Sequence, residues 1–245
     1  MRAISNIISS IVSSELVFSA GERRAPLTLK VSPRARVMRL RVDPRTGAVL
    51  LTVPRRVSRR RALEWAAGQR QWVETALAAV PAPEPIRPGM TIPLHGRPHL
   101  LDWSPERPRT VHIADDGRIL VGGPLEGLEA RVLRGLKRHA QAVLERESRA
   151  FAAPRGLEVA KVRVGDTLSR WGSCSSTGTL RYSWRLILAP DFVRRATVAH
   201  EVAHLVHMNH GPDFHALVAD LLGADPKPAR DWLRREGATL HRLFR

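Results

Sequence analysis

The sequence predicts an α+β protein whose N-terminal region is rich in antiparallel strands. Residues 25–53 alternate apolar and polar positions in short runs separated by turn-forming residues, as half-buried strands do. Longer stretches with helical periodicity follow in blocks rather than after every strand. The resulting order of strands, helix, strands, helix, strands and helices favours α+β over a regular βαβ alternation.

The first 80 residues divide into two segments. Residues 1–14 predict a disordered extension and no cleavable signal peptide, because serine pairs interrupt their apolar residues. Residues 15–80 predict a β-rich region with antiparallel strands in 25–54 and one amphipathic helix over 58–80, capped by Ser58. The predicted inner face of that helix carries Ala62, Trp65, Ala66, Trp72, Val73, Ala76 and Leu77.

Residues 81–124 begin with "PAPEPIRPG", which is too rich in proline for a helix or a central strand and predicts a linker. Two β-hairpins follow, with turns at His95-Gly96 and Asp116-Gly117. Residues 125–245 form the last predicted region. Its expected elements are a helix over 125–151, strands within 157–165 and 179–188, and helices over 191–208, 212–222 and 226–243.

Bulk composition narrows the possible classes of protein. A chain of 245 residues with 43% hydrophobic content can bury a sizeable core. It contains no run of about 18 apolar residues, so no membrane span is predicted. The single cysteine, Cys174, excludes an internal disulfide framework and is typical of a reducing compartment, so we expect a cytoplasmic protein.

The formal net charge is +17, which is typical of proteins that bind nucleic acid. All but four of the 40 basic residues are arginine, a bias that coding composition also produces. The basic runs are therefore either solvated surfaces or phosphate contacts, and nucleic acid stays open as an alternative partner.

The segment "HEVAHLVHMNHGPDFH" carries the chemistry of the chain. His200 and His204 are four residues apart on a predicted helix, so both imidazoles lie on one face and can reach one metal ion. Glu201 then lies beside the ion, where a general base for a bound water is needed. The surrounding residues are apolar, so the helix should be buried, and a metal compensates for burying these polar groups.

A catalytic zinc site usually has three protein ligands and one open position. His207 continues the face of His204 but lies a turn too far along the helix, and His215 is better explained by packing. Asn209 and Gly211-Pro212 predict a turn that can bring His210 back towards the ion. His210 is therefore the favoured third ligand. The remaining candidates are Asp213, Asp220 and Glu236.

The segments "RWGSCSSTGTLRYSWRLILAP" and "VAHEVAHLVHMNHGPDFHALV" together resemble the YgjP-like metallopeptidase family, and the resemblance covers most of residues 25–243. It implies a zincin-like metallopeptidase core in which His200, His204 and His210 bind Zn²⁺ and Glu201 is the catalytic acid/base. The histidine spacing also matches metzincins and the WLM family, whose members cleave proteins crosslinked to DNA. Metzincins have glycine where this chain has His207, and no methionine turn follows.

The loop "LSRWGSCSS" offers further candidates for the active site. Trp171 is expected to anchor the core beside a tight turn, while Ser173 and nearby backbone N–H groups could stabilise an oxyanion. Arg170 either binds a substrate carboxylate or is a surface arginine, and Cys174 is expected to be a small buried hydrophobe. The strand within 179–188 is the candidate edge that pairs with an extended peptide, by analogy with zincins.

The sequence thus predicts a zinc-dependent hydrolase that cleaves peptide bonds in a peptide or protein substrate. The first alternative is a nucleic-acid-associated protein whose zinc site is structural or acts on DNA-bound proteins. The second is a zinc-stabilised scaffold without turnover, but such a scaffold has no need of Glu201 beside an open coordination position. No oligomeric state is predicted.

Overall fold

The computed structural model describes residues 16–20, 23–43, 46–78, 80, 84–167, 170–241 and 243–244. Residues 1–14, the predicted extension, lie outside the described residues. The chain divides into two compact units between residues 82 and 83. Both units combine helices with sheets that contain parallel and antiparallel pairs, so the predicted α+β class is confirmed.

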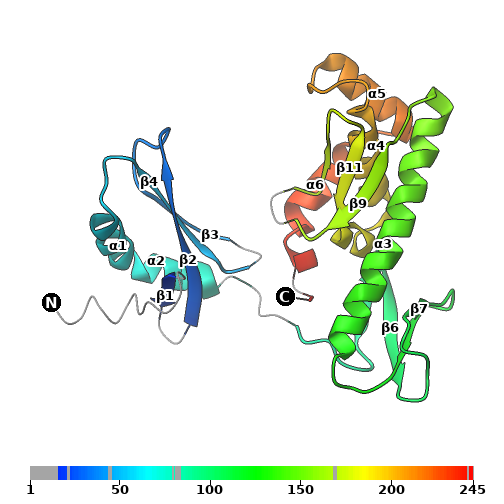
Figure 1. Cartoon of the computed structure of the whole chain (residues 1–245), viewed down its shortest axis with the longest axis horizontal. Coiled ribbons are helices and arrows are strands. Elements are labelled where there is room, and N and C mark those ends of the chain that lie inside the picture. The colour runs from blue at the N-terminus through cyan, green and yellow to red at the C-terminus, as the bar shows by residue number, and fades with distance from the viewer. Residues whose placement is uncertain are drawn as a thin grey trace. The chain divides into compact units, whose positions relative to one another are not determined.

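The first unit packs a sheet of strand order β1-β2-β4-β3 against helices α1 and α2 (Figure 1). Phe18 and Leu51 are fully buried between the sheet and the helices, together with Ala66 and Val73 from the helices. The elements of this unit are β1 (Leu16–Ala20), β2 (Arg23–Ser32), β3 (Arg39–Val42), β4 (Val49–Pro54), α1 (Arg59–Gly68) and α2 (Arg70–Ala78).

The prediction of antiparallel pairing throughout this sheet is wrong for its central pair. β2 runs parallel to β4, with Leu27 opposite Val49, and β4 separates β2 from β3. An alternating pattern states which face of a strand is buried but not which strand lies beside it. β4 is mostly buried, whereas β3 is largely exposed, so β4 takes the central position and β3 the edge.

The predicted helix of the first unit is interrupted. Its N-cap is as expected, because the Ser58 side chain accepts a hydrogen bond from the Arg61 amide at 3.3 Å. The helix breaks at Gln69, directly after Gly68, and α2 begins at the next residue. Beyond the break Trp72 is 49% exposed, so its predicted place on the inner face is wrong.

The second unit is built around the long helix α3, which runs beside sheet β10-β11-β9 and helix α4 (Figure 1). A second sheet, of order β5-β6-β8-β7, contributes to the same core, and the turns at His95-Gly96 and Asp116-Gly117 form as predicted. The strands of this unit are β5 (Thr91–Leu94), β6 (Arg97–Ser104), β7 (His112–Ile113), β8 (Arg118–Gly122), β9 (Lys161–Gly165), β10 (Gly172–Cys174) and β11 (Thr179–Ser183). The helices are α3 (Leu128–Ala152), α4 (Asp191–Ala203), α5 (Pro212–Leu222) and α6 (Lys227–Glu236).

Three expected elements end earlier than predicted. The strand β11 stops at Ser183, and a buried 3₁₀ helix, Trp184–Leu188, replaces the rest of it. β11 lies between β10 and β9, so the prediction that it forms a sheet edge is wrong; β10 and β9 are the edges. Helix α4 stops at Ala203 rather than at residue 208, and α6 stops at Glu236 rather than at 243.

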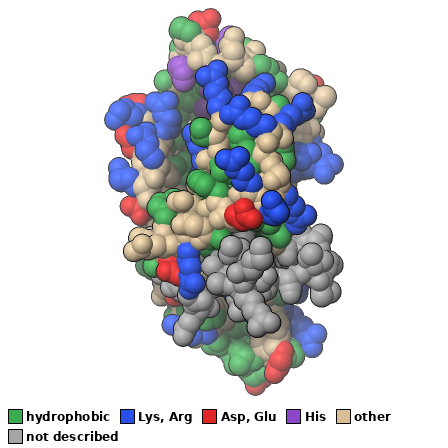
Figure 2. Space-filling view, turned by 90° about the vertical axis from the view of Figure 1, so that its left-hand side faces the viewer, with side chains coloured by type: hydrophobic (Ala, Val, Ile, Leu, Met, Phe, Trp, Pro, Cys, Tyr) green, Lys and Arg blue, Asp and Glu red, His purple; other side chains and the backbone are tan. Residues whose placement is uncertain are grey.

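The surface of the chain is strongly basic. Figure 2 shows Lys and Arg side chains spread over the displayed face, with fewer Asp and Glu side chains among them. This distribution agrees with the formal net charge of +17. None of the helices in the described part of the chain has both the length and the apolar character of a membrane span.

Candidate metal centre

Helix α4 carries His200, and the residue that caps its C-terminus is His204; one face of this helix is buried. Val198 and Val202, four residues apart, are fully buried, and the side chain of Asp191 lies in the first turn, where the helix dipole favours an acid. Glu201 is 5% exposed, so the turn that carries the metal candidates is anchored in the core.

Three imidazoles converge at the end of this helix. The ring nitrogens of His200, His204 and His210 that face one another all lie within 4.8 Å, and they are the one such group of three found in the described residues. The Nε2 atoms of His200 and His210 are 3.3 Å apart. His207, His215 and the acids Asp213, Asp220 and Glu236 are not in this group.

The chain returns His210 to the helix through a tight turn. The amides of Val206 and His207 both donate to the carbonyl of Ala203, at 3.1 and 3.0 Å. Helix α5 then begins directly after its N-cap residue, Gly211. Asn209 does not take the left-handed conformation that often ends helices, since His95 and Phe244 are the non-glycine residues with positive φ in the described chain. The helix ends by closing on its last carbonyl, so no left-handed residue is needed.

A backbone contact orients His204. Its Nδ1 lies 2.9 Å from the carbonyl oxygen of His207, and because a carbonyl only accepts, the Nδ1–H of His204 must donate. Its Nε2 is then left with a free lone pair, the form that binds a metal. His207 therefore contributes to the site through its backbone.

The ring of Phe214 packs against all three imidazoles. It is fully buried, and its ring centroid lies 4.9, 4.5 and 4.7 Å from those of His200, His204 and His210. Burial, followed by the neighbouring imidazoles, lowers the pKa of His200 to about 4. The ring is therefore neutral near pH 7, as a metal ligand must be.

These donors fit a tetrahedral zinc ion. Zn–N bonds of about 2.0–2.1 Å place two ligand nitrogens about 3.3 Å apart, which matches the separation between His200 and His210. Three nitrogen donors leave a fourth position open, as catalytic zinc sites do. His200, His204 and His210 would hold the ion.

Glu201 lies beside this centre and against the backbone of β10. A Cβ added at Gly172 would be 2.5 Å from the Oε1 atom of Glu201, so only glycine allows the carboxylate to lie here. Burial raises the pKa of Glu201 to about 7, and the charge of Arg170 acts in the opposite direction. A buried carboxylate next to three imidazoles is suited to accept and return a proton.

A family model describing the YgjP-like metallopeptidase domain matches residues 36–236, which is most of the chain. The chain belongs to the YgjP-like metallopeptidase family. Membership in this family implies a metal ion and a hydrolase, and the matched segment contains the three imidazoles. Neither the search of curated proteins nor the search of solved structures found a match.

The candidate residues Arg170, Trp171, Ser173 and Cys174 differ in how they are placed relative to this YgjP-like site. Trp171 is partly buried against the core and also lines a cavity beside His200 and Glu201. Arg170 is exposed, yet its charge reaches Glu201. Ser173 follows Gly172 in the strand, so its side chain points to the opposite face from Glu201. Cys174 is half-buried, and burial followed by the charge of Glu201 raises its pKa.

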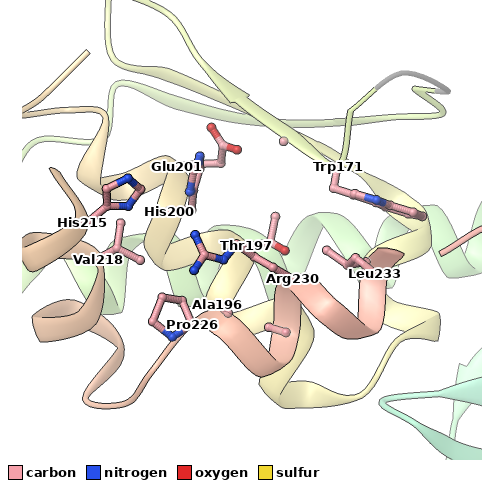
Figure 3. A pocket seen from close by; sticks show the side chains of 12 residues that line it. Trp171, Ala196, Thr197, His200, Glu201, His215, Val218, Pro226, Arg230 and Leu233 are labelled. Atoms are coloured by element: carbon pink, nitrogen blue, oxygen red, sulfur yellow. The ribbon is translucent and has the colours of Figure 1, made fainter. Parts of the chain in front are cut away.

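The same cavity contains residues that the sequence analysis did not single out. It has a volume of about 200 Å³ and lies between α4, α5 and α6 (Figure 3). Thr197, Val218 and Arg230 line it, and His215 lies at one end. Thr197 precedes His200 by three residues, a helical spacing that could have indicated it, but α6 carries no comparable signal for Arg230.

Proposed function

We propose that this protein is a zinc-dependent peptidase with a zincin-like core and Glu201 as its general base. The observation that carries the proposal is the convergence of three histidine nitrogens within 4.8 Å beside a buried carboxylate. A purely structural site has no use for a buried acid with a raised pKa next to an open coordination position.

Different residues have different roles in the proposed reaction. When bound, zinc acidifies a coordinated water and polarises the substrate carbonyl. Glu201 takes the proton from the attacking water and then passes it to the leaving amine. His207 keeps His204 in the tautomer that binds the ion, and Gly172 leaves room for the carboxylate.

The edge strand β10 is the proposed substrate contact in place of β11. Across the β10–β11 pair, the Ser183 amide donates to the Trp171 carbonyl and the Ser175 amide donates to the Thr179 carbonyl. Bonded and non-bonded pairs alternate along an antiparallel ladder, so the backbone N–H and C=O groups of Gly172 and Cys174 point away from β11. No other described strand pairs with β10. An extended peptide can add to this edge directly beside Glu201.

Metal analysis tests the ligand set. We expect about one zinc per chain in the purified protein, as three-histidine sites hold, and weaker retention in the His210→Ala variant. The control is His215→Ala, because His215 lies nearby but outside the ligand group. Full zinc content in His210→Ala would move the third ligand elsewhere, and failure to bind added zinc would refute the proposal.

Gly172→Ala should reduce peptide hydrolysis about 100-fold, the effect of a displacement near 1 Å in a catalytic group, while zinc stays bound. The new Cβ would come within 2.5 Å of Oε1 and 2.6 Å of Cγ of Glu201, so the whole side chain must move. Gly165→Ala in β9 is the matched control, because a Cβ there meets nothing within 4 Å. Casein hydrolysis and zinc content are measured for both variants, and unchanged hydrolysis in Gly172→Ala would contradict the assigned position.

A further inference from the structure

The cavity beside His200 and Glu201 has mostly apolar walls. α4 contributes Ala196, α5 contributes Val218, and α6 contributes Ala229 and Leu233, while Trp171 covers one end (Figure 3). Its volume of about 200 Å³ suits a side chain rather than a whole small molecule. Because Glu201 lines the same cavity, any group bound there lies next to the reacting bond.

Arg230 brings a positive charge into this apolar cavity. Its side chain extends from α6 towards His200 (Figure 3). Arg230 is exposed, so a substrate can reach its side chain.

Among the described residues, no hydrogen bond or ion pair involves the guanidinium of Arg230. The nearby acids are already paired: Asp231 with Lys227 and Arg234, and Asp220 with Arg155. Glu201 is the one carboxylate among the residues that line the cavity, and Arg170, not Arg230, is the cation that affects its pKa. The charge of Arg230 is therefore available to a ligand.

We propose that Arg230 binds a carboxylate of the substrate and so makes the enzyme select peptides with an acidic group next to the scissile bond. This inference rests on the proposed peptidase function. A guanidinium pairs with a carboxylate through two parallel hydrogen bonds, and apolar surroundings strengthen the pair. The methylene groups of a glutamate side chain would pack against Val218 and Leu233. A free C-terminal carboxylate offers the same chemistry.

Cleavage mapping tests the selection. β-Casein is digested, and the residues on both sides of each cleaved bond are identified by mass spectrometry. We expect Asp, Glu or chain ends to be enriched next to cleaved bonds, and the enrichment to fall at least about ten-fold in Arg230→Gln, the loss expected for a hydrogen bond to a charged group. Arg235→Gln is the matched control, because Arg235 lies on the same helix outside the cavity and its change removes the same charge.

A binding measurement separates this inference from the proposed activity. The Glu201→Gln chain is titrated calorimetrically with acetyl-Ala-Ala-Glu-Ala-Ala-amide and with the matched Gln peptide, before and after zinc is removed by a chelator. We expect the Glu peptide to bind at least about ten-fold more tightly, and the preference to disappear when Arg230→Gln is added but not when Arg235→Gln is added. Survival of the preference after chelation shows that the carboxylate is not simply a zinc ligand.

A third pair of peptides, acetyl-Ala-Ala-Gln with a free or an amidated C-terminus, identifies the source of the carboxylate. Preference for the free acid that depends on Arg230 assigns the contact to chain ends, and preference for the internal Glu assigns it to side chains. Equal binding of all peptides by the Glu201→Gln chain, with casein hydrolysis by the wild type intact, would overturn the inference and leave the proposed peptidase function in place. Loss of zinc binding and hydrolysis would instead refute the proposed function. The titration after chelation would still test whether Arg230 binds the carboxylate.

Discussion

Glu201→Gln should abolish peptide hydrolysis while the protein keeps its zinc. A positioned general base contributes about 10²–10⁴-fold to such reactions, and glutamine keeps the shape of glutamate without its ability to accept a proton. The loss should be at the upper end of that range, because Glu201 is 5% exposed and lies against Gly172, where no other base can take its place. Casein hydrolysis and metal content are measured on the same preparation.

Glu236→Gln provides the comparison for Glu201→Gln. Glu236 is an acid of the same unit that is not in the group of ligand atoms, so its variant should keep both zinc and hydrolysis. Hydrolysis that survives in Glu201→Gln would remove Glu201 from its assigned role. Zinc lost from Glu201→Gln would show that this carboxylate is a ligand rather than a base.

Arg185→Met should lower the free energy of unfolding of the second unit by about 3–5 kcal/mol, the usual cost of breaking a buried charged pair. The side chain of Arg185 is 3% exposed. Its guanidinium donates to both carboxylate oxygens of Asp166, at 2.7 and 3.0 Å. It also donates to the carbonyls of Leu240, Leu243 and Phe244, at 2.8, 2.8 and 3.1 Å. Methionine fills similar space but leaves these acceptors without a donor.

Urea unfolding followed by tryptophan fluorescence measures this loss. Arg181→Met in the neighbouring strand is the control, because Arg181 is exposed and its change should alter the free energy by less than about 0.5 kcal/mol. A loss in Arg185→Met no larger than in this control would contradict the assigned role of the guanidinium.

The same variant should change how stability depends on pH. Burial raises the pKa of Asp166, but the hydrogen bonds and charge of Arg185 outweigh it, so the pKa lies below its ordinary value of 3.8. A carboxyl with a depressed folded-state pKa stabilises the fold above its unfolded pKa, and that contribution disappears as pH falls through the folded pKa. We expect the wild type to lose this part of its stability below about pH 4, whereas Arg185→Met lacks it at every pH.

Several features of the site follow from local sequence alone. His200 and His204 are one helical turn apart, so their shared face is a property of the helix and needs no tertiary information. The apolar residues around them predicted a buried helix, and Val198 and Val202 are fully buried. His210 was predicted to be the third ligand because Asn209 and Gly211-Pro212 were expected to turn the chain after the helix. In the structure its Nε2 lies 3.3 Å from the Nε2 of His200. The stop itself lies at Ala203, earlier than the pattern indicated.

Pairing between distant segments was not predictable in the same way. An alternating pattern states which side chains face the core, but the choice of neighbouring strand depends on how whole surfaces pack. For this reason the parallel pairing of β2 with β4 and the central place of β11 were predicted incorrectly. The basic composition likewise predicts nucleic-acid binding only as an alternative, and it stays a prediction.

The sequence by itself determined the family, the α+β class and the pattern that places two imidazoles and a carboxylate on one helix, because each depends on residues close together in the chain. Only the tertiary structure decided what surrounds them. Gly172 meets Glu201 from strand β10, and Arg230 reaches the cavity from α6. These contacts join segments far apart in sequence, and they arise from the packing of their helices and strands in one core.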